Sequence, residues 1–353
     1  MEPNLPRANP PAPSRQLLID RPHRLFERPD RHNHPLYVVT PIFNPIRWRS
    51  RWRLYEDFKD MVVNAGHQAQ LVTIEVAFGD RDFVVTTPND PFNIQLRSDW
   101  PSTDLWIKEN LINLAVSRLP ADWKYVAWVD SDVLFARPDW ADETVHQLQY
   151  YSFVQMWSQY QDLNSDGELI GTANGFMDNY VSGRYDFTKP PAAGYYYPYG
   201  KPGYPGAPGL AWACRRDAWD AVGGLIDTAI LGACDYYTVF ALIGGVQRVI
   251  RKGYHKNFLD AMMSWQERAE RLIRRNVGVV KGLALHYPHG PKKFRRYATR
   301  DQILIDCQFD PTHDLKRDRQ GVYHLVDHGT LRDIKLRDGI RAYFRQRNED
   351  MPV

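Results

Sequence analysis

Two carboxylates separated by one residue, Asp130 and Asp132, are the side chains of this sequence best suited to chemistry. They follow the apolar run 125–129, whose composition favours a strand. Alternate side chains of a strand share a face, so both carboxylates would point to one place. Carboxylates held this close repel each other unless a cation lies between them. A hard divalent ion that bridges to a diphosphate is the simplest such cation, and a turn in which both residues cap the next element is the alternative.

Bulk composition fits one large α/β domain. The chain has 353 residues, 43% of them hydrophobic, which is enough for a sizeable core. A net charge of +3 does not suit a strong polyanion binder. Cys214, Cys234 and Cys307 have no metal-binding spacing, which favours a reducing compartment. No apolar stretch approaches roughly 18 residues and no signal-peptide pattern opens the chain, so we expect a cytoplasmic protein without a membrane span.

Shifts in composition divide the chain into three parts. Residues 1–34 are rich in proline and arginine and predict an extended, largely disordered arm. Residues 35–310 carry the periodic apolar pattern of a folded domain, in which we distinguish the halves 35–135 and 136–310. Residues 311–353 predict a C-terminal helical extension on the periphery of that domain.

In the first half, strands and helices alternate. We predict strands at 36–41, 71–78, 83–87 and 125–129, and helices at 49–65 and 104–118, the second capped by Ser102 or Thr103. This order predicts a mainly parallel, doubly wound sheet with helices on both faces. Ligands of such sheets bind at the carboxyl ends of the strands, and Asp130 and Asp132 lie at one of these ends.

In the second half, the regular elements surround an unusual segment. We predict helices at 140–150, 215–222, 235–243, 260–275 and 331–347, and strands at 152–157 and 277–286. The segment 189–209 is packed with proline, glycine and tyrosine and cannot be a regular helix or a central strand. A loop of this length inside a domain is usually a lid or a binding loop, and a passive surface loop is the alternative.

Three further motifs accompany the D-x-D pattern that ends strand 125–129. The first is W-x-K-E-N at residues 106–110. The second is the run 209–224, a small-residue strand that leads into a helix ending at Gly223-Gly224. The third is H-x-x-H-G at 286–290, followed by R-Y-x-x-R at 296–300. With these motifs the chain from about residue 36 to 310 resembles a GT-A type glycosyltransferase, and it also resembles uncharacterised bacterial and phage-type proteins that share them.

The resemblance implies a GT-A fold, which is a Rossmann-like mixed sheet with helices on both faces in one large domain. It implies a nucleotide-sugar half at 35–135 and an acceptor half at 136–310, with the lid at 189–209. It also implies a donor, most simply a UDP-sugar, bound at strand ends, at the helix before the D-x-D strand and by a basic cluster at 292–300. The residues expected on the donor are Thr40, Pro41, Arg51, Glu75, Lys108, Asn110, Asp130 and Arg296. A solvated surface is the alternative both for the helix face at Lys108 and Glu109 and for the basic cluster.

A metal ion and a general base are also implied by the resemblance. A late histidine commonly completes the metal site of this superfamily, so Asp130 and Asp132 would be joined by His286 or His289. Imidazole with carboxylates suits Mn²⁺ better than Mg²⁺. Asp235 matches the position of the family's general base, which takes a proton from an acceptor hydroxyl; a helix N-cap is its alternative role. The family's commonest motif has paired acids here, whereas Asp235 is followed by two tyrosines.

The acceptor is left open between two classes. Trp212, Tyr197 and Tyr199 would stack on a sugar or on the acceptor. The acceptor is either a glycan or lipid-linked saccharide, or a hydroxymethylated base of phage-type DNA lying in a groove formed by 1–34, 260–275 and 292–300.

Two other functions compete with the transferase. One is a non-catalytic carbohydrate-binding protein on a transferase-like fold. The other is a metal-dependent nucleotide-sugar pyrophosphorylase or hydrolase, which would usually carry a glycine-rich loop with lysine near its N-terminus; the sequence shows none there.

Overall fold

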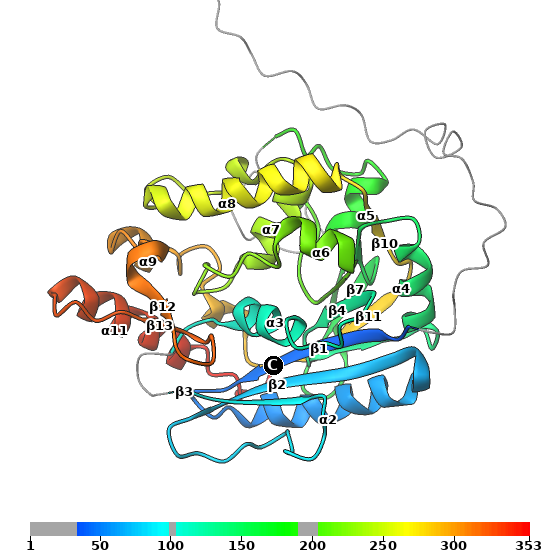
Figure 1. Ribbon diagram of the computed structural model, residues 1–353, viewed down its shortest axis with the longest axis horizontal. Helices are drawn as coiled ribbons and strands as arrows, with labels where there is room; N and C mark the ends of the chain where they lie inside the picture. The colour runs from blue at the N-terminus through cyan, green and yellow to red at the C-terminus, as the bar shows by residue number, and fades with distance from the viewer. Residues whose placement is uncertain (1–33, 99–103, 190–203) are drawn as a thin grey trace, which may run out of the picture.

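The computed structural model describes residues 34–98, 104–189 and 204–353. The order of their elements along the chain and in space is shown in Figure 1. Nearly all of the predicted arm, the cap at Ser102 or Thr103, and the lid residues 190–203 with Tyr197 and Tyr199 lie outside the described residues. Within the described part, no helix combines the length and the apolar character needed to cross a bilayer.

A seven-stranded mixed sheet forms the centre of the molecule, in the order β10-β6-β9-β4-β1-β2-β3. Its strands are β1 (Leu36–Phe43), β2 (Ala69–Phe78), β3 (Asn93–Ser98), β4 (Tyr125–Val129), β6 (Phe153–Gln155), β9 (Ala211–Arg215) and β10 (Val277–Val279). Strand β9 runs antiparallel to β4 and β6, and the other pairs are parallel. The predicted α/β class with a mixed, mainly parallel sheet is therefore confirmed.

Helices cover both faces of this sheet, as predicted. Helix α2 (Arg49–Asn64) lies on one face, and α3 (Lys108–Val116) lies on the other with α6 (Arg216–Val222), α7 (Cys234–Leu242) and α8 (Lys256–Arg268) beyond it (Figure 1). The alternation along β1 produces this arrangement. Leu36 and Val38 join the core under α2, whereas Tyr37 and Val39 join the core under α3.

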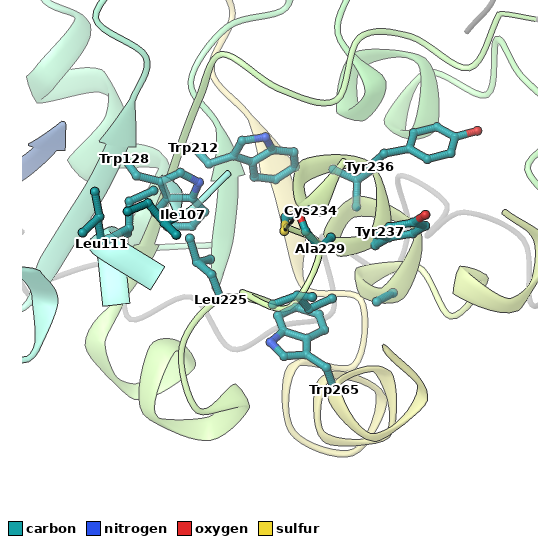
Figure 2. Close-up of a cluster of buried hydrophobic side chains, with 14 of the residues drawn as sticks. Ile107, Leu111, Trp128, Trp212, Leu225, Ala229, Cys234, Tyr236, Tyr237 and Trp265 are labelled. Atoms are coloured by element: carbon teal, nitrogen blue, oxygen red, sulfur yellow. Dashed lines mark hydrogen bonds between the residues drawn. The ribbon is translucent and has the colours of Figure 1, made fainter. Parts of the chain in front are cut away.

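The core on the α3 side is rich in aromatic residues. Figure 2 shows Trp128, Trp212 and Trp265 among the side chains of α3, α7 and the segment that joins α6 to α7. Trp212 is 4% exposed and its indole Nε1 donates to the carbonyl of Pro208 at 2.6 Å. The predicted acceptor-stacking role of Trp212 is thus corrected, because its ring is core packing on the buried face of β9.

A second, four-stranded sheet carries the late histidines. Its order is β5-β11-β7-β8, with β5 (Val133–Phe135), β7 (Gln159–Leu163), β8 (Leu169–Asn174) and β11 (Leu283–His286). The single strand predicted at 277–286 is two strands in two sheets, β10 and β11, separated at Lys281 and Gly282. In β11, His286 pairs with Val133 of β5 on one side and with Asp162 of β7 on the other.

Two other predicted elements differ from the structure for visible reasons. Residues 83–87 form no strand, because the Glu75 carboxylate accepts hydrogen bonds from the backbone N–H groups of Val84, Val85 and Thr86 (2.7–3.1 Å) and holds them in a loop. Glu75 is therefore structural and not a nucleotide ligand. Helix α3 begins at Lys108 and not at 104, since the N–H of Trp106 donates to the carbonyl of Ile230 (2.8 Å).

The remaining elements flank the sheets or form the C-terminal layer. They are α4 (Trp140–Leu148), α5 (Phe176–Val181), α9 (Gln302–Asp306), α10 (Pro311–Asp314), β12 (Leu315–Arg317), β13 (Tyr323–Leu325) and α11 (Leu331–Gln346). The predicted 260–275 helix is α8, which starts earlier, plus a π-helical turn at Ala269–Ile273. The C-terminal residues are not peripheral, because Ile340, Tyr343 and Phe344 of α11 are buried in the α3-side core.

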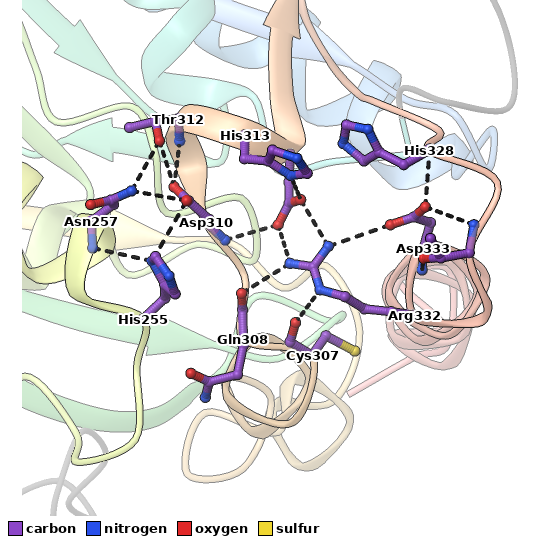
Figure 3. A network of polar contacts seen from close by, with 12 residues as sticks. His255, Asn257, Cys307, Gln308, Asp310, Thr312, His313, His328, Arg332 and Asp333 are labelled. Atoms are coloured by element: carbon purple, nitrogen blue, oxygen red, sulfur yellow. Dashed lines mark hydrogen bonds and ion pairs between the residues drawn. The ribbon is translucent and has the colours of Figure 1, made fainter.

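Arg332 ties α11 to the rest of the C-terminal layer (Figure 3). Its Nε donates to the carbonyl of Cys307 at 2.7 Å, its Nη2 to the carbonyl of Gln308 at 2.9 Å, and both Nη atoms contact the carboxylate of Asp314. Asp314 is 1% exposed. The guanidinium therefore neutralises a buried carboxylate and satisfies two carbonyls at the same time.

We expect Arg332→Ala to lower the free energy of unfolding by about 1–3 kcal/mol, because it leaves the buried Asp314 carboxylate without its ionic partner. The matched control is Arg337→Ala on the same helix, whose partner Asp338 is exposed and whose loss should change stability little. Denaturant unfolding followed by circular dichroism measures both. Equal midpoints for the two variants would contradict the role assigned to Arg332.

Candidate active site

A cavity of about 240 Å³ opens at the carboxyl ends of β1 and β4, where the sheet topology places ligands. Its wall includes the starts of α3 and α7, the end of β11 and the end of the chain. Of the predicted site residues, the cavity brings together Pro41, Arg51, Lys108, Asp130, Asp132, Asp235, His286 and His289. Thr40, Glu75, Asn110, Arg296 and Trp212 do not line it.

Asp132, His286 and His289 form a compact cluster in this cavity. The carboxylate Oδ2 of Asp132 lies 2.7 Å from Nε2 of His289 and 3.6 Å from Nε2 of His286. Backbone pairing sets this approach, because His286 lies opposite Val133 and the N–H of Tyr287 donates to the carbonyl of Asp132 at 2.9 Å. One ligand atom from each of the three residues lies within 4.8 Å of the others, so together they could hold one metal ion.

Each imidazole of the cluster has a carboxylate behind it. Nδ1 of His286 lies 2.6 Å from Oδ1 of Asp162, and Nδ1 of His289 lies 3.5 Å from Oε2 of Glu349. A proton on Nδ1 that faces a carboxylate leaves the lone pair on Nε2, and Nε2 is the atom that faces Asp132 in both rings. Carboxylates placed behind histidines in this way are typical of metal-binding sites.

Two further observations fit a cation between these residues. Oδ1 of Asp132 is buried and has no hydrogen-bond partner within the described part of the chain, which is costly unless another group binds it. Burial alone would raise the pKa of Asp132, yet in the absence of a metal ion the protonated forms of His289 and His286 lower it well below the usual range. Asp132 is thus an ionised acceptor with an unused oxygen, and imidazole with carboxylate suits Mn²⁺.

Asp130 does not join the metal cluster. Its carboxylate forms an ion pair with Nζ of Lys108, at the start of α3. Strand β4 ends at Val129, and the N–H of Val133 donates back to the carbonyl of Asp130 at 3.2 Å, so the two aspartates lie in a turn. The alternate-face rule does not extend into a turn, and the prediction of Asp130 as a metal ligand is corrected for that reason.

Asp235 lines the same cavity from the first turn of α7. Its Oδ1 accepts from the N–H of Tyr236 at 2.8 Å, while the N-cap is Ala233, so the predicted N-cap role is replaced by a first-turn position. Gly209 makes room for this carboxylate, because a Cβ at Gly209 would lie 2.5 Å from Oδ2 of Asp235. The carboxylate of Asp235 therefore packs against the backbone of Gly209, where no side chain intervenes, in the wall of the cavity.

Three predicted donor-binding residues lie away from the cavity wall. Asn110 is 1% exposed and connects α3 to the loop before β13, since it donates to the carbonyl of Gly321 and accepts from the N–H of Tyr323 (both 3.1 Å). Thr40 is fully buried, on the α2 side of β1. Arg296 is exposed, and Arg295 lines the cavity instead.

Arg295 is a buried cation that faces the cavity. It is 7% exposed, and its Nη1 donates to the hydroxyl of Tyr297 at 3.0 Å. Its Nε has no hydrogen-bond partner, and no carboxylate from the described ranges lies within 4.0 Å of it. An unneutralised, buried guanidinium is suited to an anion such as a phosphate group. The R-Y-x-x-R motif marked this segment but not which arginine turns inward.

The end of the chain supplies residues that sequence patterns did not indicate. Glu349 is 1% exposed and accepts from Arg51 (Nε–Oε2 2.6 Å, Nη2–Oε1 2.9 Å) and from Nε of Arg347 (2.6 Å). Gly290, with φ of +78°, lets the chain end approach, because a Cβ there would lie 2.7 Å from Cα of Glu349. No local signal in the sequence links positions so far apart.

Known proteins can now be compared with this fold and cavity. No family model and no curated protein sequence matches the chain. Among solved structures, the catalytic domain of Drosophila beta1,4-galactosyltransferase 7 with xylobiose matches at 11% identity and a TM-score of 0.32, covering 71% of this chain and 65% of that one. A mutant of the same enzyme with manganese, UDP-Gal and xylobiose matches at 11% identity and a TM-score of 0.35, covering 83% and 93%.

A mannosyltransferase from Pyrobaculum calidifontis, in complex with GDP-Man and Mn²⁺, matches at 14% identity and a TM-score of 0.38, covering 90% of this chain and 76% of that one. These solved structures are glycosyltransferases.

We expect Mn²⁺ affinity to depend on Asp132 and its histidines, and much less on Asp130. Asp132→Asn should abolish measurable binding, and Asp162→Asn, which removes the carboxylate behind His286, should weaken it about 10–100-fold. Asp130→Asn is the matched control and should bind Mn²⁺ nearly as the wild type does. Calorimetric titration measures all four proteins, and a larger loss for Asp130→Asn than for Asp132→Asn would show that the cluster is misassigned.

Proposed function

We propose that this protein is a metal-dependent glycosyltransferase that moves a sugar from a nucleotide-diphosphate sugar to an acceptor hydroxyl. The observation that carries the proposal is the arrangement of His286 and His289 around Asp132. Each imidazole is backed by a carboxylate and directs Nε2 at Oδ2 of Asp132, whose Oδ1 has no hydrogen-bond partner among the described residues. Buried basic residues beside this cluster support a diphosphate as the neighbouring ligand.

Asp132, His286 and His289 would hold the cation, which supplies Lewis-acid stabilisation of the departing diphosphate when it is bound. Arg295 would donate to a phosphate oxygen, because its unused Nε and its burial make it a preorganised anion ligand. Arg51 and Pro41, both on the cavity wall, would contact the nucleoside side. Lys108 would neutralise Asp130 and so keep an anionic donor from being repelled.

Asp235 would take the proton of the acceptor hydroxyl. Its side chain lines the cavity from the start of α7, and a carboxylate is a suitable base if it reaches the hydroxyl. For the donor we propose a UDP-sugar, with a GDP-sugar as the second to test.

For the acceptor, the structure favours a saccharide over DNA. The predicted DNA groove needs an exposed basic face at 292–300, yet Lys292 pairs with Asp162 while Arg295 and Arg300 are buried and line the cavity. Only part of this cluster, including Lys293 and Arg296, faces solvent. Within 292–300, most of the positive charge therefore serves the interior of the cavity, and few cations of this segment are left to follow a phosphate backbone.

A panel of nucleotide sugars with Mn²⁺, scored for release of nucleoside diphosphate, tests the proposal. We expect at least one donor to be consumed by the wild type, and no turnover by Asp132→Ala, which lacks the ligand carboxylate. If sugar binding persists in Asp132→Ala and no donor is consumed by the wild type, the protein is a carbohydrate-binding protein. Release of a sugar phosphate instead of a nucleoside diphosphate would indicate a pyrophosphorylase or hydrolase.

The acceptor is tested by salt dependence. Turnover on an oligosaccharide should change little with added salt, because few phosphate contacts are involved. Turnover on duplex DNA that contains hydroxymethylated bases would instead fall steeply with salt. A steep fall, together with faster turnover on DNA than on any saccharide, would reverse our choice of acceptor.

The position of Asp235 gives a sharper prediction. Asp235→Asn should lower kcat by about 10²–10⁴-fold, because it removes the base. Gly209→Ala should also lower kcat, since the new Cβ displaces the same carboxylate without altering its chemistry. Gly171→Ala is the matched control, because a Cβ there meets no atom within 4 Å. A normal rate for Gly209→Ala would show that the observed place of Asp235 does not matter for transfer.

A further inference from the structure

Glu109 is a buried carboxyl group that the roles above leave unused. It is the second residue of α3, it is 6% exposed, and its Oε2 has no hydrogen-bond partner in the part of the chain that the structure describes. The solvated surface position weighed from the sequence is wrong for this residue, because the first turn of α3 faces the cavity. Cys234 and the backbone N–H of Glu109 hydrogen-bond this carboxyl group, but a buried oxygen left without a partner is costly for the fold, which indicates a use for it in the site.

The groups around Glu109 keep the pKa of its carboxyl group close to neutral pH. Burial raises the pKa of Glu109 to about 7; Lys108 beside it on α3 opposes this rise, and Asp235 on α7 adds to it. Cys234, also on α7, is a buried thiol whose own pKa is raised well above its usual range, so it stays neutral. A carboxyl group with these neighbours can accept and release a proton near neutral pH.

A small cavity adjoins the main one at this point. It has a volume of about 20 Å³, and its wall includes Glu109, Asp235, Lys108 and the hydroxyl-bearing Thr238. A space of this size can hold one water molecule that has polar partners, and Glu109, Asp235 and Thr238 offer such partners in a wall that also includes apolar residues such as Trp212 and Leu225. Glu109 and Asp235 line both cavities, so the two carboxyl groups share a wall between the site of reaction and a space for a water.

We propose that Glu109 is a second proton-carrying residue of the transfer and acts as a pair with Asp235. This inference rests on the glycosyl transfer proposed above. As the acceptor oxygen bonds to the anomeric carbon, its O–H bond breaks and the proton passes to Asp235. The bond from the anomeric carbon to the diphosphate breaks, and the diphosphate leaves with the electron pair. The proton then moves from Asp235 through the small cavity to Glu109, and reaches solvent after the products leave.

This pairing gives a reason for two acidic residues, Glu109 and Asp235, to line a cavity whose wall also includes buried cations such as Arg295. Asp235 must be ionised at the start of each turnover, and it regains that state only if another group takes its proton. Glu109 offers that group within the protein. It can do so only when it is itself ionised, so the rate of transfer should rise with pH as Glu109 loses its proton.

The test is the pH dependence of kcat at saturating donor, acceptor and Mn²⁺. The wild type should show a rate that falls on the acid side with a midpoint near 7, which is the value for Glu109. Glu109→Gln should lose this acid limb and lower kcat on the order of 10²-fold, with the KM for the donor unchanged. Glu56→Gln on α2, which removes an exposed acid, is the matched control and should keep the wild-type profile.

The outcomes separate this role from the function on which it rests. If Glu109→Gln keeps the wild-type acid limb, the role of Glu109 is overturned while the transferase function stands. If the wild type neither transfers the sugar of any donor nor hydrolyses any donor, the proposed function and this role of Glu109 are both wrong. If Glu109→Gln does not fold, Glu109→Asp takes its place: a shifted midpoint supports the role, and an unchanged midpoint overturns it.

Discussion

The site depends on one backbone constraint, the position of β11 between β5 and β7. Because β11 pairs with both strands, His286 lies beside the residue that follows Asp132 and opposite Asp162. The imidazole is thereby fixed between two carboxylates without a long side chain or a flexible loop. The pairing of three short strands thus meets a requirement of metal sites. The imidazole of His286 is held in one orientation by the contact of its Nδ1 with Asp162, and Nε2 stays available as a ligand atom.

Charge burial is the second organising feature. Many of the charged groups around the cavity are neutralised in pairs, as with Lys108 and Asp130, or Lys292 and Asp162. Glu349 serves two guanidinium groups at once. Buried ion pairs contribute little net stability but are costly to break. Three buried side-chain atoms of the cavity wall, Oδ1 of Asp132, Nε of Arg295 and Oε2 of Glu109, have no hydrogen-bond partner among the described residues, and they are consequently the informative ones.

The sequence predicted those parts of the site whose signal is local. The D-x-D strand, the H-x-x-H pair and most elements of the sheet were visible as short patterns, because periodicity and turn chemistry act over few residues. Asp130 was misplaced as a ligand because the strand ends one residue before it. Trp212 and Asn110 were misplaced because burial, which only the fold determines, decides whether a polar or aromatic group packs or binds. Glu349 could not be found, since its partners Arg51 and His289 lie far away in the sequence.

The C-terminal segment has a consequence for shortened forms of the protein. Asp350 caps the start of α2 by accepting from the N–H groups of Arg49 and Ser50 at 3.0 and 2.8 Å, and Glu349 contacts both Arg51 and His289. The first helix and the loop of His289 are therefore joined by residues that lie far later in the chain than α2. A truncation before Glu349 would keep every side chain of the metal cluster, yet it would leave two guanidinium groups of the cavity wall, Arg51 and Arg347, without the carboxylate that they share.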